Sequence, residues 1–484
     1  MENRIPTYPA APSPRRRLRA AAAGLAAALL LPLLAAPRPA RAMMSVEEEK
    51  ELGARLLRMV KEQAQLVEDP EVVGYVRGVG RKVLAQVGTS FFDYRFFVIQ
   101  DAALNAFAMP GGLVFVHSGL IEAVDNEDEL LCVIAHEIGH VEGRHVARRM
   151  ERMQRVNLAT AAMAIAGIFL GSPKAGSAIL ATSGALNASI ALKYSRADEE
   201  EADRRGYAWI CKAGYDPGGL IAVLKKMQRH RWLGSDRIPS YLSTHPGAAE
   251  RVTYLEHQRA YRPCPQRVPQ DNFELRRVQV RLRVLTSDPR VLVERYRREL
   301  AATPKDSLLR FGLAEALLAA RDYDAALALF RELAEQEGDA RPRFRADLGR
   351  ALFTAGRYAE ARKVLTTYLE AHPGDDGARF LLARTLLELG NAGAALPLLG
   401  RLSGDWPEAP GLDFQLGRAL AAAGRTGEAH YHFYLHYLRS GDARAAAYHR
   451  DRALALLPAG SPLRRKLVPP GERNATRAEE EAGR

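Results

Sequence analysis

The sequence predicts a mostly α-helical chain in which an α+β domain with a small β-sheet precedes an all-α repeat solenoid. Two observations carry this prediction. Short β-rich runs stand among longer helical stretches in residues 43–262, and a Leu/Ala-rich pattern recurs at a nearly constant spacing after residue 290. The 484 residues, 47% of them hydrophobic and 26% charged, suit two to three folded domains and exclude a wholly disordered chain.

Residues 1–42 have the composition of an export signal. Four arginines between residues 15 and 19 form a basic start, a Leu/Ala run covers residues 20–36, and Ala40-Arg41-Ala42 has the small residues of a cleavage site. We therefore expect export, by the general or the twin-arginine route, and cleavage after Ala42. The alternative is an uncleaved N-terminal anchor, although the apolar run is marginal for a membrane span.

Within residues 43–262 the pattern predicts helices around three strands. Residues 46–88 carry apolar side chains at helical spacing, and residues 94–99 form a β-rich run. Residues 106–117 are interpreted as two strands joined by a Pro-Gly-Gly turn. A long helix is expected over residues 126–150, because Asn126 can cap its start and arginines occupy its end.

Residues 291–460 contain a repeated pattern. Leu313, Leu348, Leu382 and Leu416 each begin a Leu-x-x-x-Leu segment, at spacings of 34 to 35 residues, and a second Ala-rich segment follows each. Helix pairs at this period are typical of tetratricopeptide repeats, which stack because one pair cannot bury its own apolar face. A linker and lead-in helix are expected over residues 263–290, and a disordered charged tail over residues 461–484.

Residues 156–192 are unusually apolar. They form two arms of about 15 residues each, which is too short to span a bilayer. One interpretation is a buried helical hairpin or an ordered loop. The other is a mobile element that gates a site or makes peripheral contact with a membrane.

The segment His136-Glu137-Ile138-Gly139-His140 is the sharpest chemical signal. Residues four apart lie on one face of a helix, so both imidazoles can bind one Zn²⁺, and Glu137 can act on a water molecule as general base. The apolar residues 130–135 would bury this helix, which argues against a chance match. Cys132, one turn before His136, is a weaker candidate for a fourth ligand that would make the site structural.

A catalytic zinc site needs a third protein ligand and one open position. A histidine six residues after His140 would serve, but Val146 stands there, so His145 is interpreted as a supporting or surface residue. A carboxylate from a second helix is the remaining source. Glu199 and Asp203 share a helical face; we expect Glu199 to be the ligand and Asp203 to fix the tautomer of a ligating histidine.

These motifs together resemble one protein family. His136-Glu-x-x-His140, Ser195-Arg-x-x-Glu199-x-x-Ala-Asp203 and Thr244-His245-Pro246 with Arg251 resemble the zinc endopeptidases that include the CAAX-prenyl and HtpX proteases. The segment from Asn105 to Gly112 also matches that family. With an export signal before them and repeats behind them, the resemblance covers residues 43–460 and points to the periplasmic, repeat-bearing members.

The resemblance implies a zinc-metallopeptidase domain and a periplasmic enzyme with one Zn²⁺ per chain. Its implied substrates are unfolded or stalled outer-membrane β-barrel proteins, and its repeats would bind the β-barrel assembly machinery. His245 would take the fourth zinc position and hold the enzyme off, unless it is a plain structural histidine. The alternative function is a mostly latent repeat scaffold or chaperone that binds the same machinery.

A peptide substrate would lie extended beside the zinc-binding helix. The candidate edge strand that pairs with it through backbone hydrogen bonds consists of Asn105, Ala106, Phe107, Ala108 and Met109. The same residues can also form an ordinary core strand, and one strand can do both.

The charge of the chain bears on whether it binds nucleic acid. A formal charge of +12 would suit nucleic acid, but residues 1–42 hold seven Arg and one Glu, so half of that charge leaves with the signal. We expect no nucleic-acid partner for an exported protein.

The chain has three cysteines. Cys132, Cys211 and Cys264 form an odd set, and the sequence leaves open whether any two of them are bridged.

Overall fold

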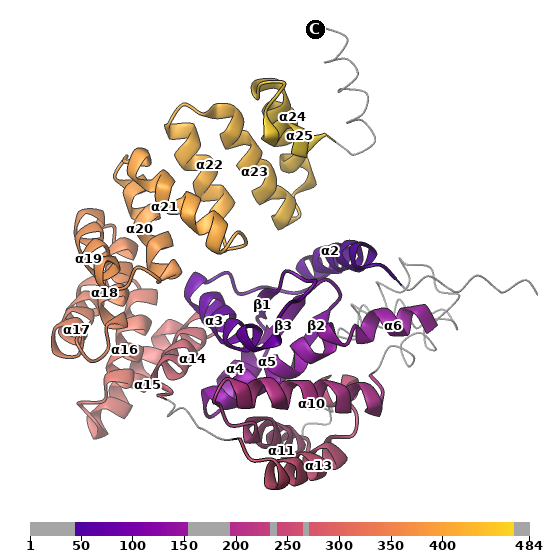
Figure 1. The fold of residues 1–484 in the computed structure, drawn as a ribbon. Helices are drawn as coiled ribbons and strands as arrows, with labels where there is room; N and C mark the ends of the chain where they lie inside the picture. Colours follow the sequence, from indigo (N-terminus) through magenta and orange to yellow (C-terminus); the bar gives the residue numbers. More distant parts are fainter. Residues whose placement is uncertain (1–43, 153–193, 233–239, 265–270, 469–484) are drawn as a thin grey trace, which may run out of the picture. The chain divides into compact units, whose positions relative to one another are not determined.

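The computed structural model describes residues 44–152, 194–232, 240–264 and 271–468 (Figure 1). The expected export signal and the apolar segment 156–192 lie outside the described residues. None of the helices in the described ranges is both long and apolar enough to cross a lipid bilayer.

The first part of the described chain combines helices with one small sheet, which confirms the predicted α+β domain. Its elements are α2 (Val46–Gln63), α3 (Pro70–Val87), β1 (Arg95–Ile99), β2 (Ala106–Met109), β3 (Leu113–His117), α4 (Ser118–Ala123), α5 (Glu127–Glu142), α6 (His145–Arg152), α10 (Arg196–Lys212), α11 (Gly218–Trp232), α12 (Ser240–Thr244) and α13 (Ala248–Tyr261).

The sheet has the strand order β1-β3-β2, with β1 parallel and β2 antiparallel to β3. The turn between β2 and β3 runs through Gly111 and Gly112, which both have a φ of 82° and so need glycine's backbone freedom. Phe97 and Phe107 stack on either side of Phe115, each at a ring-centroid distance of 4.9 Å. The two predicted strands around a Pro-Gly-Gly turn are therefore present, and β2 lies at an edge of the sheet.

Two helices fill the region 46–88 where the apolar pattern suggested helical structure throughout. The break follows from local chemistry. The side chain of Asp69 accepts hydrogen bonds from the backbone of Glu71 and Val72, and Pro70 occupies the first turn of α3. Before this cap, Leu66 forms an isolated bridge with Ile99.

Helix α5 runs through the core, with every residue from Glu127 to Val141 buried. The side chain of Asn126 caps it by accepting from the backbone N–H of Glu129. The Glu129 carboxylate, however, accepts from the backbone of Asp125 and not from the cap residue, so the capping box is incomplete.

The second part of the described chain is all-α, as the repeated pattern predicts. It consists of α14 (Phe273–Thr286), α15 (Pro289–Ala302), α16 (Ser307–Ala319), α17 (Tyr323–Gln336), α18 (Arg343–Thr354), α19 (Tyr358–Ala371), α20 (Asp376–Glu388), α21 (Ala392–Asp405), α22 (Leu412–Ala422), α23 (Thr426–Ser440), α24 (Ala443–Leu456) and α25 (Pro462–Leu467). Figure 1 shows these helices succeeding one another as antiparallel pairs.

The tail differs from its prediction at its start. Residues 461–484 were expected to be disordered, but α25 begins directly after Ser461, which caps it, and Pro462 occupies its first turn. Leu467 is buried in a small cluster with Tyr431 and Leu457, so an apolar contact holds the helix. Residues 469–484 lie outside the described part of the chain.

Candidate metal centre

Helices α5 and α10 approach each other closely at the centre (Figure 1). Gly139 makes the approach possible, because a Cβ atom there would lie 2.9 Å from both the Cα and the carbonyl oxygen of Ala202. With the backbones this near, Glu199 and Asp203 on α10 reach the histidines of α5. The start of α10 is fixed by a complete capping box between Ser195 and Asp198.

Among the described residues, one group of three or more His, Cys, Asp or Glu side chains could share a metal ion. It consists of His136, His140, Glu199 and His245, with ligand atoms within 4.8 Å of one another, and all four are buried. The Nε2 atoms of His136 and His140 lie 2.9 Å apart. The Glu199 carboxylate lies 3.4 Å from the first of these atoms and 3.5 Å from the second.

His245 joins this group from the segment between α12 and α13. Its Nδ1 atom lies 3.0 Å from the Glu199 carboxylate and 3.3 Å from Nε2 of His136. The ring of Tyr241, one helical turn earlier, stacks on it at 4.2 Å between centroids. The structure thus brings together residues from three distant segments, which sequence spacing alone could not place.

Glu137 is fully buried beside the donor group, and Oε1 lies 3.7 Å from Nε2 of His245. Neither carboxylate oxygen has a hydrogen-bond partner within the described ranges. Burial raises the pKa of this carboxyl. A buried, unpartnered carboxylate is costly unless it serves a ligand or a reaction.

The donor set fits zinc. Three imidazoles and one carboxylate are ligand types that Zn²⁺ binds in proteins, and both carboxylate oxygens of Glu137 and Nε2 of His245 are buried without a hydrogen-bond partner among the described residues. Cys132, the weaker candidate, lies outside the group: its Sγ donates to the carbonyl of Asp216 at 3.4 Å. The residues present can therefore hold the metal without it.

Asp203 contacts His136 at the ring nitrogen that faces away from the donor group, and Arg251 contacts Asp203. Oδ1 of Asp203 lies 2.7 Å from Nδ1 of His136, and Arg251 donates to both oxygens of that carboxylate at 2.7 and 2.8 Å. Arg251 also forms an ion pair with Glu199 at 2.5 Å. Burial opposes ionisation of Asp203, but Arg251 and His136 together lower its pKa to about 2.

The same charges act on the predicted ligands. Burial would raise the pKa of Glu199, but His245 and Arg251 hold it well below its usual range. Burial and Arg251 would lower the pKa of His136, but the carboxylates of Asp203 and Glu199 raise it to about 9. A metal ion would have to displace the proton that these carboxylates favour on His136.

Two further residues surround His140. His145 is fully buried, so its surface alternative is wrong; its Nδ1 lies 2.7 Å from Nδ1 of His140, and its Nε2 lies 3.3 Å from Glu201. Tyr194 stacks on a face of the His140 ring at 3.7 Å between centroids, whereas His145 meets that ring at its edge. Sequence reasoning missed Tyr194, although its position directly before the cap residue of α10 is a usable signal.

A disulfide bond joins Cys211 at the end of α10 to Cys264 after α13, and it answers the pairing that the sequence left open. Cys132 is the free, buried cysteine. The bridge closes a segment that contains His245 and Arg251, so it ties the helix that carries Glu199 to the chain that carries its neighbours.

The candidate substrate strand packs against α5. Strand β2 contains four of its five residues, all buried, and pairs with β3 on one side. Asn105 stands just before the strand, and its carbonyl accepts from the backbone of His117 at 3.0 Å. Pairing of a substrate along the outer edge of β2 stays a prediction.

Comparison with known proteins was consistent with this arrangement. Peptidase family M48 matches residues 70–259, and tetratricopeptide-repeat families match segments between residues 293 and 443. The beta-barrel assembly-enhancing protease of Escherichia coli is 30% identical over 80% of this chain and 72% of its own length. The putative enzyme of that name from Vibrio cholerae is 30% identical over 61% of this chain and 62% of its own length.

Another relative matches a smaller share of the chain. The metalloprotease LoiP of Escherichia coli is 34% identical over 34% of this chain and 61% of its own length. The family match contains all four members of the donor group together with Glu137. The chain therefore belongs to peptidase family M48 and is a metallopeptidase that carries C-terminal tetratricopeptide repeats.

Proposed function

We propose that this chain is a zinc-dependent endopeptidase of the periplasm that degrades misfolded or stalled outer-membrane proteins and assists β-barrel assembly. The observation that carries the proposal is the compact group of His136, His140 and Glu199 beside the carboxylate of Glu137, which has no hydrogen-bond partner among the described residues. The names of the relatives from Escherichia coli and Vibrio cholerae support the choice of substrate.

In this proposal His136, His140 and Glu199 hold one Zn²⁺ per chain. When bound there, zinc would supply Lewis acidity to the scissile carbonyl and to a nearby water. Glu137 takes a proton from the attacking water and delivers it to the leaving amine, since its carboxylate accepts no hydrogen bond from the described residues and its pKa is raised by burial. Asp203 keeps the Nε2 atom of His136 directed at the metal by engaging Nδ1.

The substrate lies along the outer edge of β2 in this scheme. An extended peptide that adds to the sheet gains main-chain hydrogen bonds without sequence specificity, which suits an enzyme for unfolded chains. Residues 105–109 are next to α5 in the packing, so the scissile bond of a strand added there would lie near Glu137.

His245 would be the fourth protein ligand in the resting enzyme. Its Nδ1 already lies 3.0 Å from Glu199, and a fourth protein ligand would close the site to substrate. This observation also favours the second candidate function, a mostly latent scaffold or chaperone whose repeats bind the outer-membrane assembly machinery.

The remaining parts of the chain are assigned as follows in this proposal. Residues 1–42 are removed after Ala42 on export, residues 43–262 form the peptidase domain, and residues 263–290 lead into the repeats. Residues 291–460 bind the assembly machinery. The apolar segment 156–192 makes peripheral membrane contact.

The test compares wild type, Glu137→Gln and His245→Ala on an unfolded outer-membrane β-barrel protein, with zinc content measured for each. We expect His245→Ala to cleave faster than wild type and Glu137→Gln to bind zinc without cleaving. Zinc-loaded wild type and His245→Ala that both fail to cleave would refute the protease and favour the scaffold. Equal cleavage by those two proteins would refute the role of His245 as a switch.

A further inference from the structure

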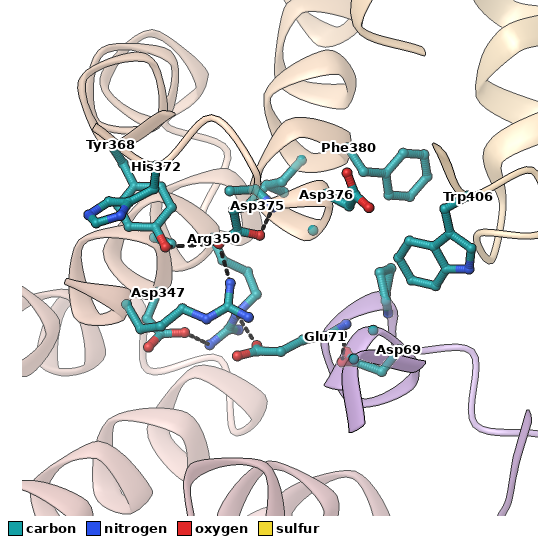
Figure 2. A pocket seen from close by; sticks show the side chains of 18 of the residues that line it. Asp69, Glu71, Asp347, Arg350, Tyr368, His372, Asp375, Asp376, Phe380 and Trp406 are labelled. Carbon is teal, nitrogen blue, oxygen red and sulfur yellow. Dashed lines mark hydrogen bonds and ion pairs between the residues drawn. The ribbon is translucent and has the colours of Figure 1, made fainter. Parts of the chain in front are cut away.

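A second site lies away from the metal centre. A pocket of about 660 Å³ separates the start of α3 from helices α18 and α20 of the repeats. Figure 2 shows carboxylates and rings around it, with Asp69 and Glu71 from the start of α3 and Phe380 and Trp406 from the repeats. None of the metal-centre residues lines this pocket, so its chemistry needs a separate explanation.

The carboxylates of the pocket are already neutralised. Each of the five that line it lies within ion-pairing distance of an arginine, as Asp69 does with Arg281 at 2.5 Å and Asp376 with Arg77 at 3.2 Å. These pairs stabilise the packing of α3 against the repeats. They leave no carboxylate of the lining free to attract a cation from outside.

The arginines are not all neutralised. Six of them line the pocket, and four have carboxylate partners. Within the described part of the chain, Arg81 and Arg384 form no ion pair. Arg81 is exposed at the rim, whereas Arg384 is partly buried in the wall. The lining therefore carries excess positive charge at a defined place.

Comparison with the neighbouring repeats shows that the lack of a described ion pair is particular to Arg384. Arg350, Arg384 and Arg418 occupy the same position of successive repeats, each 34 residues after the last. Arg350 pairs with Glu315, and Arg418 pairs with Glu388 at 2.9 Å. Of these three arginines, Arg384 alone lacks a described carboxylate partner, although it holds the equivalent position in its repeat.

Aromatic rings hold the Arg384 guanidinium in place. It lies over Phe353 at 4.7 Å and near Phe380 at 5.9 Å from the ring centroids. Burial lowers the pKa of this group, because removal from water disfavours its charge. A carboxylate that entered the pocket could form a bidentate pair with the Arg384 guanidinium and so compensate for its lost hydration.

We propose that this pocket binds a carboxylate carried by a polypeptide segment with an adjacent aromatic residue. Arg384 pairs with the carboxylate, Arg81 attracts it from the rim, and the aromatic residue packs against the small exposed parts of Phe380 and Trp406 that line the pocket. A pocket of about 660 Å³ exceeds what a lone anion needs and accommodates several residues. That the bound segment belongs to a substrate or an assembly partner rests on the proposed function.

The carboxylate can come from a chain terminus or from an Asp or Glu side chain, and peptides distinguish the two. The probes are three short fluorescent peptides of neutral residues: one ending in Phe with a free α-carboxylate, its C-terminal amide, and that amide with Asp beside Phe. Binding to the full chain bearing Glu137→Gln is followed by fluorescence anisotropy, so that hydrolysis does not interfere.

We compare Arg384→Gln with Arg418→Gln, a matched change one repeat further on. Gly78→Leu is added because a Cβ at Gly78 meets nothing within 4 Å and a larger side chain there enters the pocket from α3. Thermal unfolding of each variant shows that it is folded. At least one acid-bearing peptide should bind, with about tenfold loss in Arg384→Gln and in Gly78→Leu and less than about twofold loss in Arg418→Gln.

Binding of only the free acid assigns the site to chain termini, and binding of the Asp-containing amide assigns it to side chains. The proposal is overturned if the neutral amide binds as tightly as both acids, or if Arg384→Gln and Arg418→Gln bind alike. Because the assay uses a chain that cannot cleave, loss of peptidase activity leaves this result unaffected. Failure of the proposed enzyme and failure of this pocket are therefore separable.

Discussion

Oδ1 of Asp203 lies 2.7 Å from Nδ1 of His136, and the same carboxylate is held from behind by Arg251. This chain of contacts fixes the imidazole so that Nε2 faces Glu199 and His140. A histidine ligand generally depends on such a partner for its tautomer and its orientation.

Asp203→Asn should weaken zinc binding by about 10–100-fold, because an amide neither fixes the tautomer nor supplies the negative charge. Competition with a chromogenic chelator measures the loss. Glu200→Gln is the control, since Glu200 is exposed on the same helix. Equal zinc affinity of Asp203→Asn and wild type would contradict the assigned role.

His145→Ala should also weaken zinc binding, by about tenfold, because His140 loses the buried neighbour at its Nδ1 atom. His257→Ala serves as the control, because it removes an exposed histidine. Zinc affinity is again the readout, and thermal unfolding separates loss of the ligand from loss of the fold. If both variants retained wild-type affinity, His145 would be a packing residue only.

The metal centre was predictable where its residues follow a helical period and less so where the tertiary fold decides. Spacings of four along two helices predict His136 with His140 and Glu199 with Asp203, and the structure brings all four together. His245 was singled out through family resemblance, and its distance to Glu199 depends on how α12 and α13 pack. Tyr194 and Tyr241 stack on histidines of the group, and no periodic pattern in the sequence predicts these contacts.

In the fold, too, features set by local sequence are predictable and features set by tertiary packing are not. The repeats and the two strands around Pro-Gly-Gly follow from local periodicity and turn chemistry, and both are present. The break between α2 and α3 depends on the Asp69 cap, which an apolar pattern does not register. The disulfide was undecidable from sequence, because only the fold sets which cysteines are near.

Gly139→Ala should separate α5 from α10, because its Cβ would lie 2.9 Å from the backbone of Ala202. We expect a loss of about 1–3 kcal/mol in the free energy of unfolding, together with weaker zinc binding. Gly393→Ala is the matched control in a helix, because its Cβ meets nothing within 4 Å. That variant should be neutral or stabilised by up to about 1 kcal/mol. The same behaviour of both variants would show that the helices do not need this contact.

The disulfide between Cys211 and Cys264 should be required for stability, because it joins cysteines 53 positions apart and closes the segment that contains His245 and Arg251. Reduction should lower the free energy of unfolding by about 2–5 kcal/mol, since the bridge restricts the unfolded chain. Denaturant titration with and without reductant measures this, and Cys211→Ser combined with Cys264→Ser should be insensitive to reductant.

Thiol counting tests the same bond independently of stability. Cys132 is 3% exposed, and burial raises the pKa of its thiol, so the native protein should react with no thiol reagent. One thiol should react after unfolding and all three of the chain's cysteines after reduction as well. Three reactive thiols before reduction would mean that α10 and the end of α13 are held by packing alone, and the expected sensitivity to reductant would then vanish too.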